Sequence, residues 1–212
     1  MLTWSDPLPT PHSLAGSLDH WSLNGYKLSS LDEHFKSSVH SFTRLEDRYY
    51  LSLSNGSLYA LGREHCRPEC YGLLGLGLNV TSTFKPTEIT GLRGVRMLKF
   101  CGSGANFVLA LSTSGQLWSW GSNHEGQLGV GASLDASYEP LLVPLDHFVI
   151  DVCCAPGYAL ALSQTGVLWT WGANLKGRLG LGPDRWSRYF LDNLVRPLNY
   201  KLAKVGLSFS MF

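Results

Sequence analysis

Residues 108–131 read VLALSTSGQLWSWGSNHEGQLGVG, and residues 159–182 read ALALSQTGVLWTWGANLKGRLGLG. The second stretch repeats the first 51 positions later, with glycine and tryptophan in the same places. A third copy lies upstream, where residues 50–62 read YLSLSNGSLYALG and residues 72–77 read GLLGLG. A fixed period of about 50 residues is the signature of a repeat architecture. The repeat is therefore the unit from which the fold is predicted.

The copies share a set of glycines and tryptophans, and the glycines that follow Gly62, Gly121 and Gly172 keep intervals of three and two. The signature consists of Gly62, Gly72, Gly75, Gly77, Gly115, Trp118, Trp120, Gly121, Gly126, Gly129, Gly131, Gly166, Trp169, Trp171, Gly172, Gly177, Gly180 and Gly182. Glycine is favoured at tight turns and where backbones approach closely. A phosphate-binding loop would continue as Gly-Lys-Ser or Gly-Lys-Thr, which the sequence lacks. We interpret these glycines as structural.

Each copy begins with two alternating stretches around a glycine, and this pattern predicts a hairpin of two strands. In the first copy, Asn55-Gly56 predicts a two-residue turn with positive φ at both residues. The turns of the other copies are predicted to contain one more residue, in the segments 112–115 and 163–166.

The tryptophans of each copy are two positions apart, so Trp118 and Trp120 lie on one side of a strand, as do Trp169 and Trp171. Large aromatic rings dominate the energetics of protein cores. We therefore expect these rings to pack between neighbouring sheets, and we prefer this role to ligand binding.

The segments LWSWGSNHEGQLGVG and LWTWGANLKGRLGLG, each preceded by LALS and a glycine turn, resemble the repeats of the regulator of chromosome condensation family. The resemblance covers residues from about 44 to the C-terminus. It implies an all-β fold, a β-propeller of radially arranged four-stranded blades. The 212 residues hold about three to four such blades, so we expect a partial, open propeller. The family's Gly-x-x-His-Ser is replaced here, for example by Gly104 with Phe107, which marks a divergent member.

The expected division places tandem repeats at about 44–101, 102–152 and 153–204, with the start of another at 205–212. Residues 1–43 are expected to form a degenerate or partial first blade. Both ends then fall inside blades, which predicts a fragment of a full ring or of a multidomain protein.

The 17 lysines and arginines nearly balance the 16 aspartates and glutamates, giving a net charge of +1. Binding to nucleic acid or to anionic membranes depends on clustered basic residues, so neither partner is expected. A secretory or mitochondrial leader and an apolar span of about 18 residues are not found. The five cysteines are an odd number, which argues against a disulfide framework. We expect an intracellular protein, cytoplasmic or nuclear.

The search for chemistry gives no catalytic residue, no cofactor site and no metal site. His65, Cys66 and Cys70 lie in an insertion that the other copies lack. Structural metal sites usually need four ligands, and no second ligand pair follows at a suitable spacing. Metal binding by these three residues remains the less favoured alternative. No Gly-x-Ser-x-Gly elbow is present to support a hydrolase.

A longer loop in the third copy is the candidate partner-binding segment, because Pro197 follows Gly182 by fifteen residues where the other copies have nine. Tryptophan, tyrosine and arginine are enriched at binding hot spots, and loops on rigid scaffolds often carry function. The candidate residues are Arg185, Trp186, Arg188 and Tyr189. The alternative is that Trp186 and its neighbours fold back onto the blade.

The leading functional hypothesis is a non-enzymatic propeller that binds proteins as a scaffold or regulator. The resemblance also implies an alternative, a guanine-nucleotide exchange factor for a Ran-type small GTPase, as in the family's founding member. A third hypothesis is a regulatory propeller within a larger ubiquitin ligase or kinase. The partner and the oligomeric state are not predicted.

Overall fold

The computed structural model describes residues 31–63, 72–102, 106–131 and 133–180, together with the backbone of three short strands further out. Two of these strands, β1 (Ser22–Leu23) and β2 (Tyr26–Lys27), form a small antiparallel pair. The helix α2 (Glu33–Ser38) follows, and the Asp32 carboxylate caps it by accepting a hydrogen bond from the N–H of Phe35.

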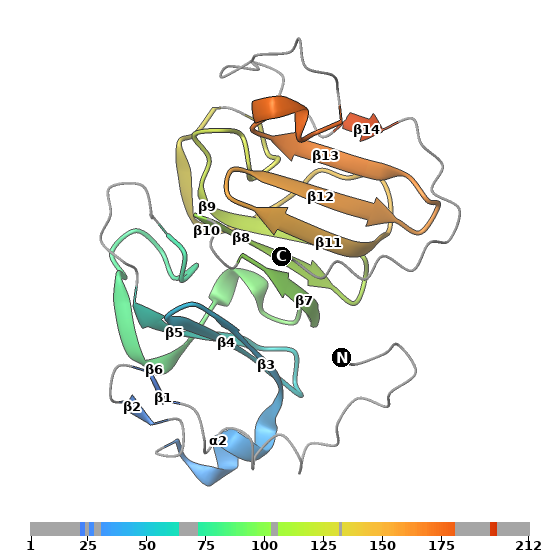
Figure 1. The fold of residues 1–212 in the computed structure, drawn as a ribbon. Coiled ribbons are helices and arrows are strands. Elements are labelled where there is room, and N and C mark those ends of the chain that lie inside the picture. The colour runs from blue at the N-terminus through green and yellow to red at the C-terminus, as the bar shows by residue number, and fades with distance from the viewer. Residues whose placement is uncertain are drawn as a thin grey trace.

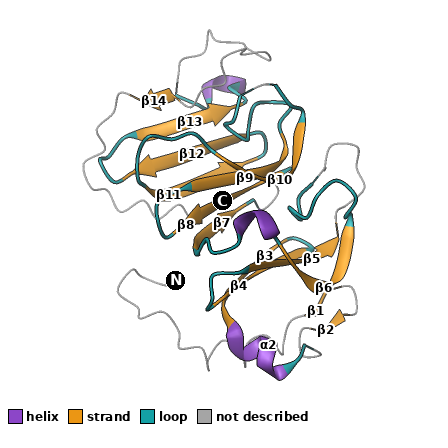
Figure 2. Cartoon of the chain, turned by 180° about the vertical axis from the view of Figure 1, so that it is seen from behind, coloured by secondary structure: helices purple, strands orange, loops and turns teal. Residues whose placement is uncertain are grey.

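Three four-stranded antiparallel sheets make up the rest of the described chain (Figures 1 and 2). The first sheet contains β3 (Val39–Leu45), β4 (Arg48–Leu53), β5 (Leu58–Arg63) and β6 (Ser82–Glu88). The second contains β7 (Met97–Cys101), β8 (Phe107–Ser112), β9 (Leu117–Ser122) and β10 (Ala136–Leu142). The third contains β11 (Val149–Ala155), β12 (Tyr158–Ser163), β13 (Leu168–Gly172) and β14 (Arg196–Leu198).

Within every sheet the strands follow each other in chain order, so each sheet is an up-and-down meander. The short 3-10 helix η2 (Thr90–Leu92) joins the first sheet to the second, and η3 (Leu175–Gly177) follows β13. The third sheet packs its first strand, β11, against β7 and β8 of the second. Figure 1 shows the sheets following one another as blades, which confirms the predicted partial, open propeller.

The sheets and the predicted sequence repeats begin and end at different residues. The second sheet runs from Met97 to Leu142, whereas the sequence period is counted from residue 102. The division into repeats at 44–101, 102–152 and 153–204 stays a prediction about the sequence unit. Of residues 1–43, the structure describes only β1, β2 and the stretch from Leu31 onward, in which β3 already belongs to the first sheet.

The central hairpins of the three sheets have loops of the same length, which corrects the prediction of a two-residue turn in the first copy and a longer turn in the others. Each loop has three residues, 54–56, 113–115 and 164–166, closed by a backbone hydrogen bond such as Leu53 N–H to Ser57 O (2.9 Å). Within the first loop only Gly56 has positive φ, at 87°, and Asn55 does not. A loop of three residues needs one left-handed residue, at its last position.

Two apolar cores lie between the sheets, and we call them the first seam and the second seam. The first seam lies between the first and second sheets; its buried residues include Leu45, Tyr50, Leu58, Ala60, Leu73, Leu74, Ile89, Leu92, Met97, Val108, Ala110 and Trp120. The second seam lies between the second and third sheets; its buried residues include Phe107, Leu109, Leu111, Leu117, Leu128, Val143, Val149, Val152, Cys154, Ala159, Ala161 and Trp171. A smaller core packs α2 against the outer face of the first sheet.

One tryptophan crosses each seam and bonds to the blade that precedes its own. The indole N–H of Trp120 donates to the carbonyl of Leu73 over 2.8 Å, and that of Trp171 donates to the carbonyl of Gln127 over 2.8 Å. Both rings are buried. A Cβ added to Gly129 would lie 2.8 Å from the Trp171 nitrogen, so the glycine lets the loop approach the ring. We call this arrangement the tryptophan lock.

Candidate functional site

The sheets share a common frame, so corresponding positions at the two seams can be compared directly. The first residue of each sheet, Val39, Met97 or Val149, pairs with the last residue of the next strand. In all three sheets the register shifts directly after this pair. The residues at the shift, which have no paired residue on the next strand, are His40, Leu98 and Ile150. The same frame aligns Ser52 with Leu111, and Arg96 with Phe148.

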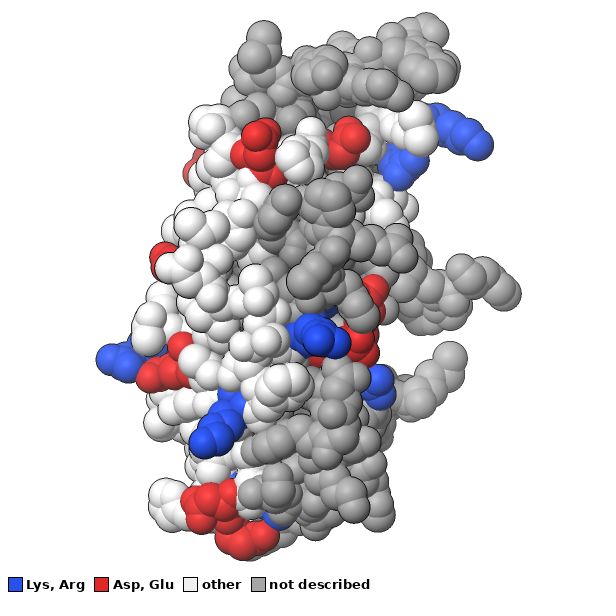
Figure 3. Space-filling view, turned by 90° about the vertical axis from the view of Figure 1, so that its left-hand side faces the viewer, with Lys and Arg blue, Asp and Glu red and all other residues white. Residues whose placement is uncertain are grey.

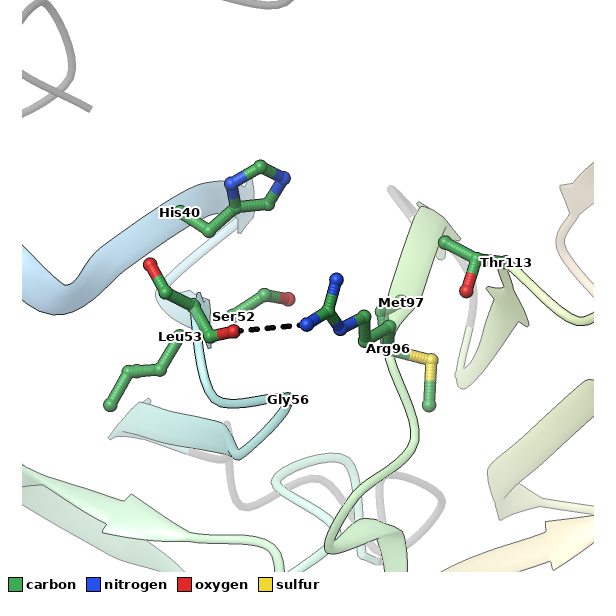
Figure 4. A pocket seen from close by; sticks show the side chains of 8 residues that line it. His40, Ser52, Leu53, Gly56, Arg96, Met97 and Thr113 are labelled. Carbon is green, nitrogen blue, oxygen red and sulfur yellow. Dashed lines mark hydrogen bonds between the residues drawn. The ribbon is translucent and has the colours of Figure 1, made fainter. Parts of the chain in front are cut away.

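A pocket of about 260 Å³ lies at the first seam, beside the hairpin loop of the first sheet (Figure 4). It is lined from the first sheet by His40, Ser52, Leu53, Ser54 and Gly56, and from the second sheet by Arg96, Met97 and Thr113. The lining contains one arginine, one histidine and three hydroxyl groups, and no carboxylate. The pocket is therefore rich in hydrogen-bond donors.

Arg96 crosses the pocket from the second sheet toward the loop of the first. Its Nη2 donates to the carbonyl of Ser54 over 3.5 Å, the dashed line in Figure 4. The stem of Arg96 passes the loop at Gly56, where an added Cβ would lie 3.5 Å from its Cγ. This contact is at the long limit of hydrogen bonding, and the Arg96 side chain is exposed.

Ser52 lines the pocket from β4 and is only 6% exposed. Its Oγ has no hydrogen-bond partner in the structure. A buried hydroxyl without a partner lowers stability, because its hydration is lost and nothing replaces it.

The second seam is apolar at the positions of Ser52, Arg96 and His40. Leu111 replaces Ser52 and is fully buried, and Phe148 replaces Arg96. The Phe148 ring packs so closely on the hairpin loop of the second sheet that a Cβ on Gly115 would lie 2.5 Å from it. Leu98 stands where the first seam has His40. The arginine and the buried serine that line this pocket have no counterpart at the aligned positions of the second seam.

A pair of thiols spans the second seam, where the Sγ atoms of Cys101 and Cys154 lie 2.8 Å apart. The hydrogen bond with Cys154 lowers the pKa of the Cys101 thiol, against the opposing effect of burial. The same hydrogen bond, with burial, raises the pKa of Cys154. Beside them, Lys99 Nζ lies 2.6 Å from Asp151 Oδ1 in an ion pair between the two sheets.

Other features of the described residues concern metals, membranes and surface charge. No group of three His, Cys, Asp or Glu side chains there could hold a metal ion. No helix in the described part is long and apolar enough to cross a bilayer. Figure 3 shows acidic and basic side chains interspersed over one face.

The predicted partner-binding residues Arg185, Trp186, Arg188 and Tyr189 lie outside the described residues, as does Gly182. The same is true of His65, Cys66 and Cys70. The remaining signature residues lie in the strands, in the loops that follow β5, β9 and β13, and, for Gly115 and Gly166, in the hairpin loops. Trp118 and Trp169 are half-buried beside the tryptophans of the lock.

The pocket was not anticipated from the sequence. Ser52 and Arg96 are far apart in the chain, and only the packing of two sheets brings them together. One signal was available: at these aligned positions the first copy is polar and the next is apolar.

The chain has relatives among curated proteins, and it spans a small part of each. It is 36% identical over 138 residues to the E3 ubiquitin-protein ligase HERC2 of Mus musculus, covering 64% of this chain and 3% of that protein. It is 36% identical over 124 residues to Protein RCC2 of Homo sapiens, covering 58% of this chain and 23% of that protein.

A solved structure and a family model agree with these matches. The chain superposes on Prp20p from Saccharomyces cerevisiae with a TM-score of 0.62 and 17% identity, covering 81% of this chain and 43% of that one. The model of the regulator of chromosome condensation (RCC1) repeat matches residues 114–162. Residues 114–162 therefore match an RCC1 repeat, and the chain is similar in sequence to RCC1-like repeat proteins over part of its length.

Proposed function

We propose that this RCC1-like propeller is a non-enzymatic interaction module that holds a partner protein at the seam between two blades. One observation carries the proposal: a donor-rich pocket at the first seam, where Leu111 and Phe148 occupy the aligned positions of Ser52 and Arg96 at the second seam. The scaffold around it is rigid, because buried rings and four-stranded sheets hold the lining residues in place.

The relatives support a role in protein binding. The solved structure of Prp20p is described together with its binding to Gsp1p and histones. Sequence identity to Prp20p is only 17%, so these partners are not transferred to this chain. An intracellular location, cytoplasmic or nuclear, belongs to the proposal.

Affinity capture with the purified chain tests the proposal. The wild-type chain is compared with a variant in which Arg96→Phe and Ser52→Leu give the first seam the side chains of the second. We expect a protein that the wild type retains at physiological salt and the variant does not. Equal retention by both would contradict the seam as the binding surface, and no retention above a tag-only control would contradict the interaction function.

The match to HERC2 favours a second candidate, a regulatory propeller within a larger ubiquitin ligase. The interaction surface would then select what the ligase acts on or what acts on it. Sequencing the full-length transcript tests this candidate. A ligase domain in the same reading frame would support it, and its absence from a complete transcript would contradict it.

Exchange-factor activity on a Ran-type GTPase is the remaining alternative. Release of a fluorescent guanosine diphosphate from the purified GTPase, with and without this chain, is the direct assay. If the chain accelerated nucleotide release by several-fold, exchange-factor activity would take the place of the interaction-only proposal.

A further inference from the structure

We propose that the pocket at the first seam binds a carboxylate side chain, from an aspartate or glutamate of the partner protein. The inference rests on the interaction function proposed above and assigns the chemistry of its ligand. It depends on the size of the pocket, on Arg96 and on Ser52.

The size of the pocket favours a side chain over a single water or a large cofactor. A cavity of about 10 to 15 Å³ on the same measure holds one water, and the pocket measures about 260 Å³. Sites for drug-sized ligands usually measure about 300 to 1,000 Å³. The pocket lies just below that range, so it suits a short polar group inserted from a protein surface.

The charge of the pocket favours an anion. Arg96 makes no ion pair with any described residue, and its one hydrogen bond to them is the 3.5 Å contact with Ser54. A guanidinium has five N–H donors in a rigid fork that matches the two oxygens of a carboxylate. No aspartate or glutamate lines the pocket to compete for that fork.

Ser52 supplies a second donor among the residues that line the pocket. Its hydroxyl is buried and has no partner in the structure. The fold does not need a polar group here, because Leu111 occupies the aligned position of the next sheet and is fully buried. A carboxylate oxygen that enters between Arg96 and Ser52 would accept from both side chains.

The experiment is an NMR titration of the isotopically labelled full chain with the blocked amino acid N-acetyl-glutamic acid N-methylamide. We expect saturable shifts at the Arg96 Nε–H and at the amides of Ser52 and Gly56. The uncharged glutamine counterpart should bind roughly tenfold more weakly, since hydrogen bonds to charged groups are the stronger ones.

The variants take their side chains from the second seam, where the same frame already accommodates them. Arg96→Phe and Ser52→Leu should each weaken binding by roughly tenfold or more. The matched control is Phe148→Leu at the second seam, which should leave binding unchanged. Dispersed amide spectra check that every variant is folded.

Three results would overturn the inference: no saturable shift at the pocket, equal binding by Arg96→Phe and wild type, or tighter binding of inorganic phosphate than of the blocked glutamate. Failure of the probe while wild type still retains a protein would reject this pocket chemistry and leave the interaction function standing. Binding of the probe with no protein retained would reject the partner protein as the source of the carboxylate.

Discussion

At the first seam the Trp120 indole donates to the carbonyl of Leu73, and at the second seam the Trp171 indole donates to that of Gln127. The donor–acceptor distance is the same, and each ring packs on a loop of the preceding blade. The surroundings differ. The first seam has a pocket lined by Ser52 and Arg96, whereas at the second seam Leu111 and Phe148 occupy the aligned positions and a thiol pair spans the two sheets.

This difference separates what holds the blades together from what can vary without loss of the fold. The tryptophan lock is common to both seams and is buried. The positions beside the hairpin loops tolerate serine or leucine, and arginine or phenylalanine, in the same frame. Repeat proteins have stabilities that are sums of intrinsic and nearest-neighbour contributions, so each seam can be tested separately.

The largest expected effect is loss of the lock. Trp120→Ala and Trp171→Ala should each lower the free energy of unfolding by about 3 to 5 kcal/mol, because a buried ring and its hydrogen bond are lost. Urea denaturation followed by circular dichroism measures the change. Trp120→Phe is the control and should cost less, since it keeps most of the ring. If either variant lowered the free energy of unfolding by less than about 1 kcal/mol, the two tryptophans would not contribute equally to stability.

The next effect concerns the glycine beneath the Trp171 ring. Gly129→Ala should destabilise through its φ of +71° and through a Cβ placed 2.8 Å from the indole nitrogen. Gly131→Ala is the matched control, because its φ is +93° but no atom lies within 4 Å of the added Cβ.

The left-handed backbone alone costs about 1 to 2 kcal/mol, and overpacking adds about 1 to 3 kcal/mol. Thermal unfolding of the two variants measures the difference. Equal losses would mean that Gly129 is required for its backbone conformation and not for the approach of the ring.

A smaller effect of opposite sign is expected at the pocket. Ser52→Ala should raise the free energy of unfolding by about 1 kcal/mol, because a buried hydroxyl without a partner is removed. The control is Ser163→Ala, since Ser163 is buried but its Oγ accepts from the N–H of Val167 over 2.9 Å. Ser163→Ala should lower the free energy of unfolding by about 1 kcal/mol. Destabilisation by Ser52→Ala would indicate that the hydroxyl contributes to the fold.

The smallest expected effect concerns the thiol pair of Cys101 and Cys154, and it is a change in the pH dependence of thiol alkylation. The pKa of Cys101 is lowered, so its thiolate forms at a lower pH than that of Cys153, whose pKa burial raises. Alkylation by iodoacetamide, followed by peptide mass spectrometry, should modify Cys101 first as pH rises. Cys154→Ala removes the hydrogen bond and should move Cys101 alkylation to higher pH. Modification of Cys153 before Cys101 would contradict this order.

The repeat unit could be predicted from sequence because its determinants are local. The spacing of Trp118 and Trp120 within one strand, and of the glycines after it, indicates a hairpin followed by a tight loop. The number of sheets follows from the period and the length. These features predicted a partial propeller, which the structure confirms.

Two features could not be predicted in the same way. The dipeptide Asn55-Gly56 suggests a two-residue turn, yet the paired strands fix a three-residue loop in which Asn55 accepts a hydrogen bond from Ser57 through its side chain. The pocket depends on Arg96 meeting a loop of another sheet, and no local pattern encodes that contact. Tertiary packing decided both features.

The lock also gives the chain a direction. Each boundary joins two unlike halves, an indole from the later blade and a carbonyl from the earlier one. During synthesis the carbonyls of Leu73 and Gln127 emerge before Trp120 and Trp171, which donate to them. At both seams the earlier blade therefore gains this hydrogen bond only when the later blade has been made. Cutting the chain between Leu142 and Val149 would therefore leave the acceptor carbonyl of Gln127 on one piece and the indole of Trp171 on the other. Each piece should bind the other piece in preference to a second copy of itself.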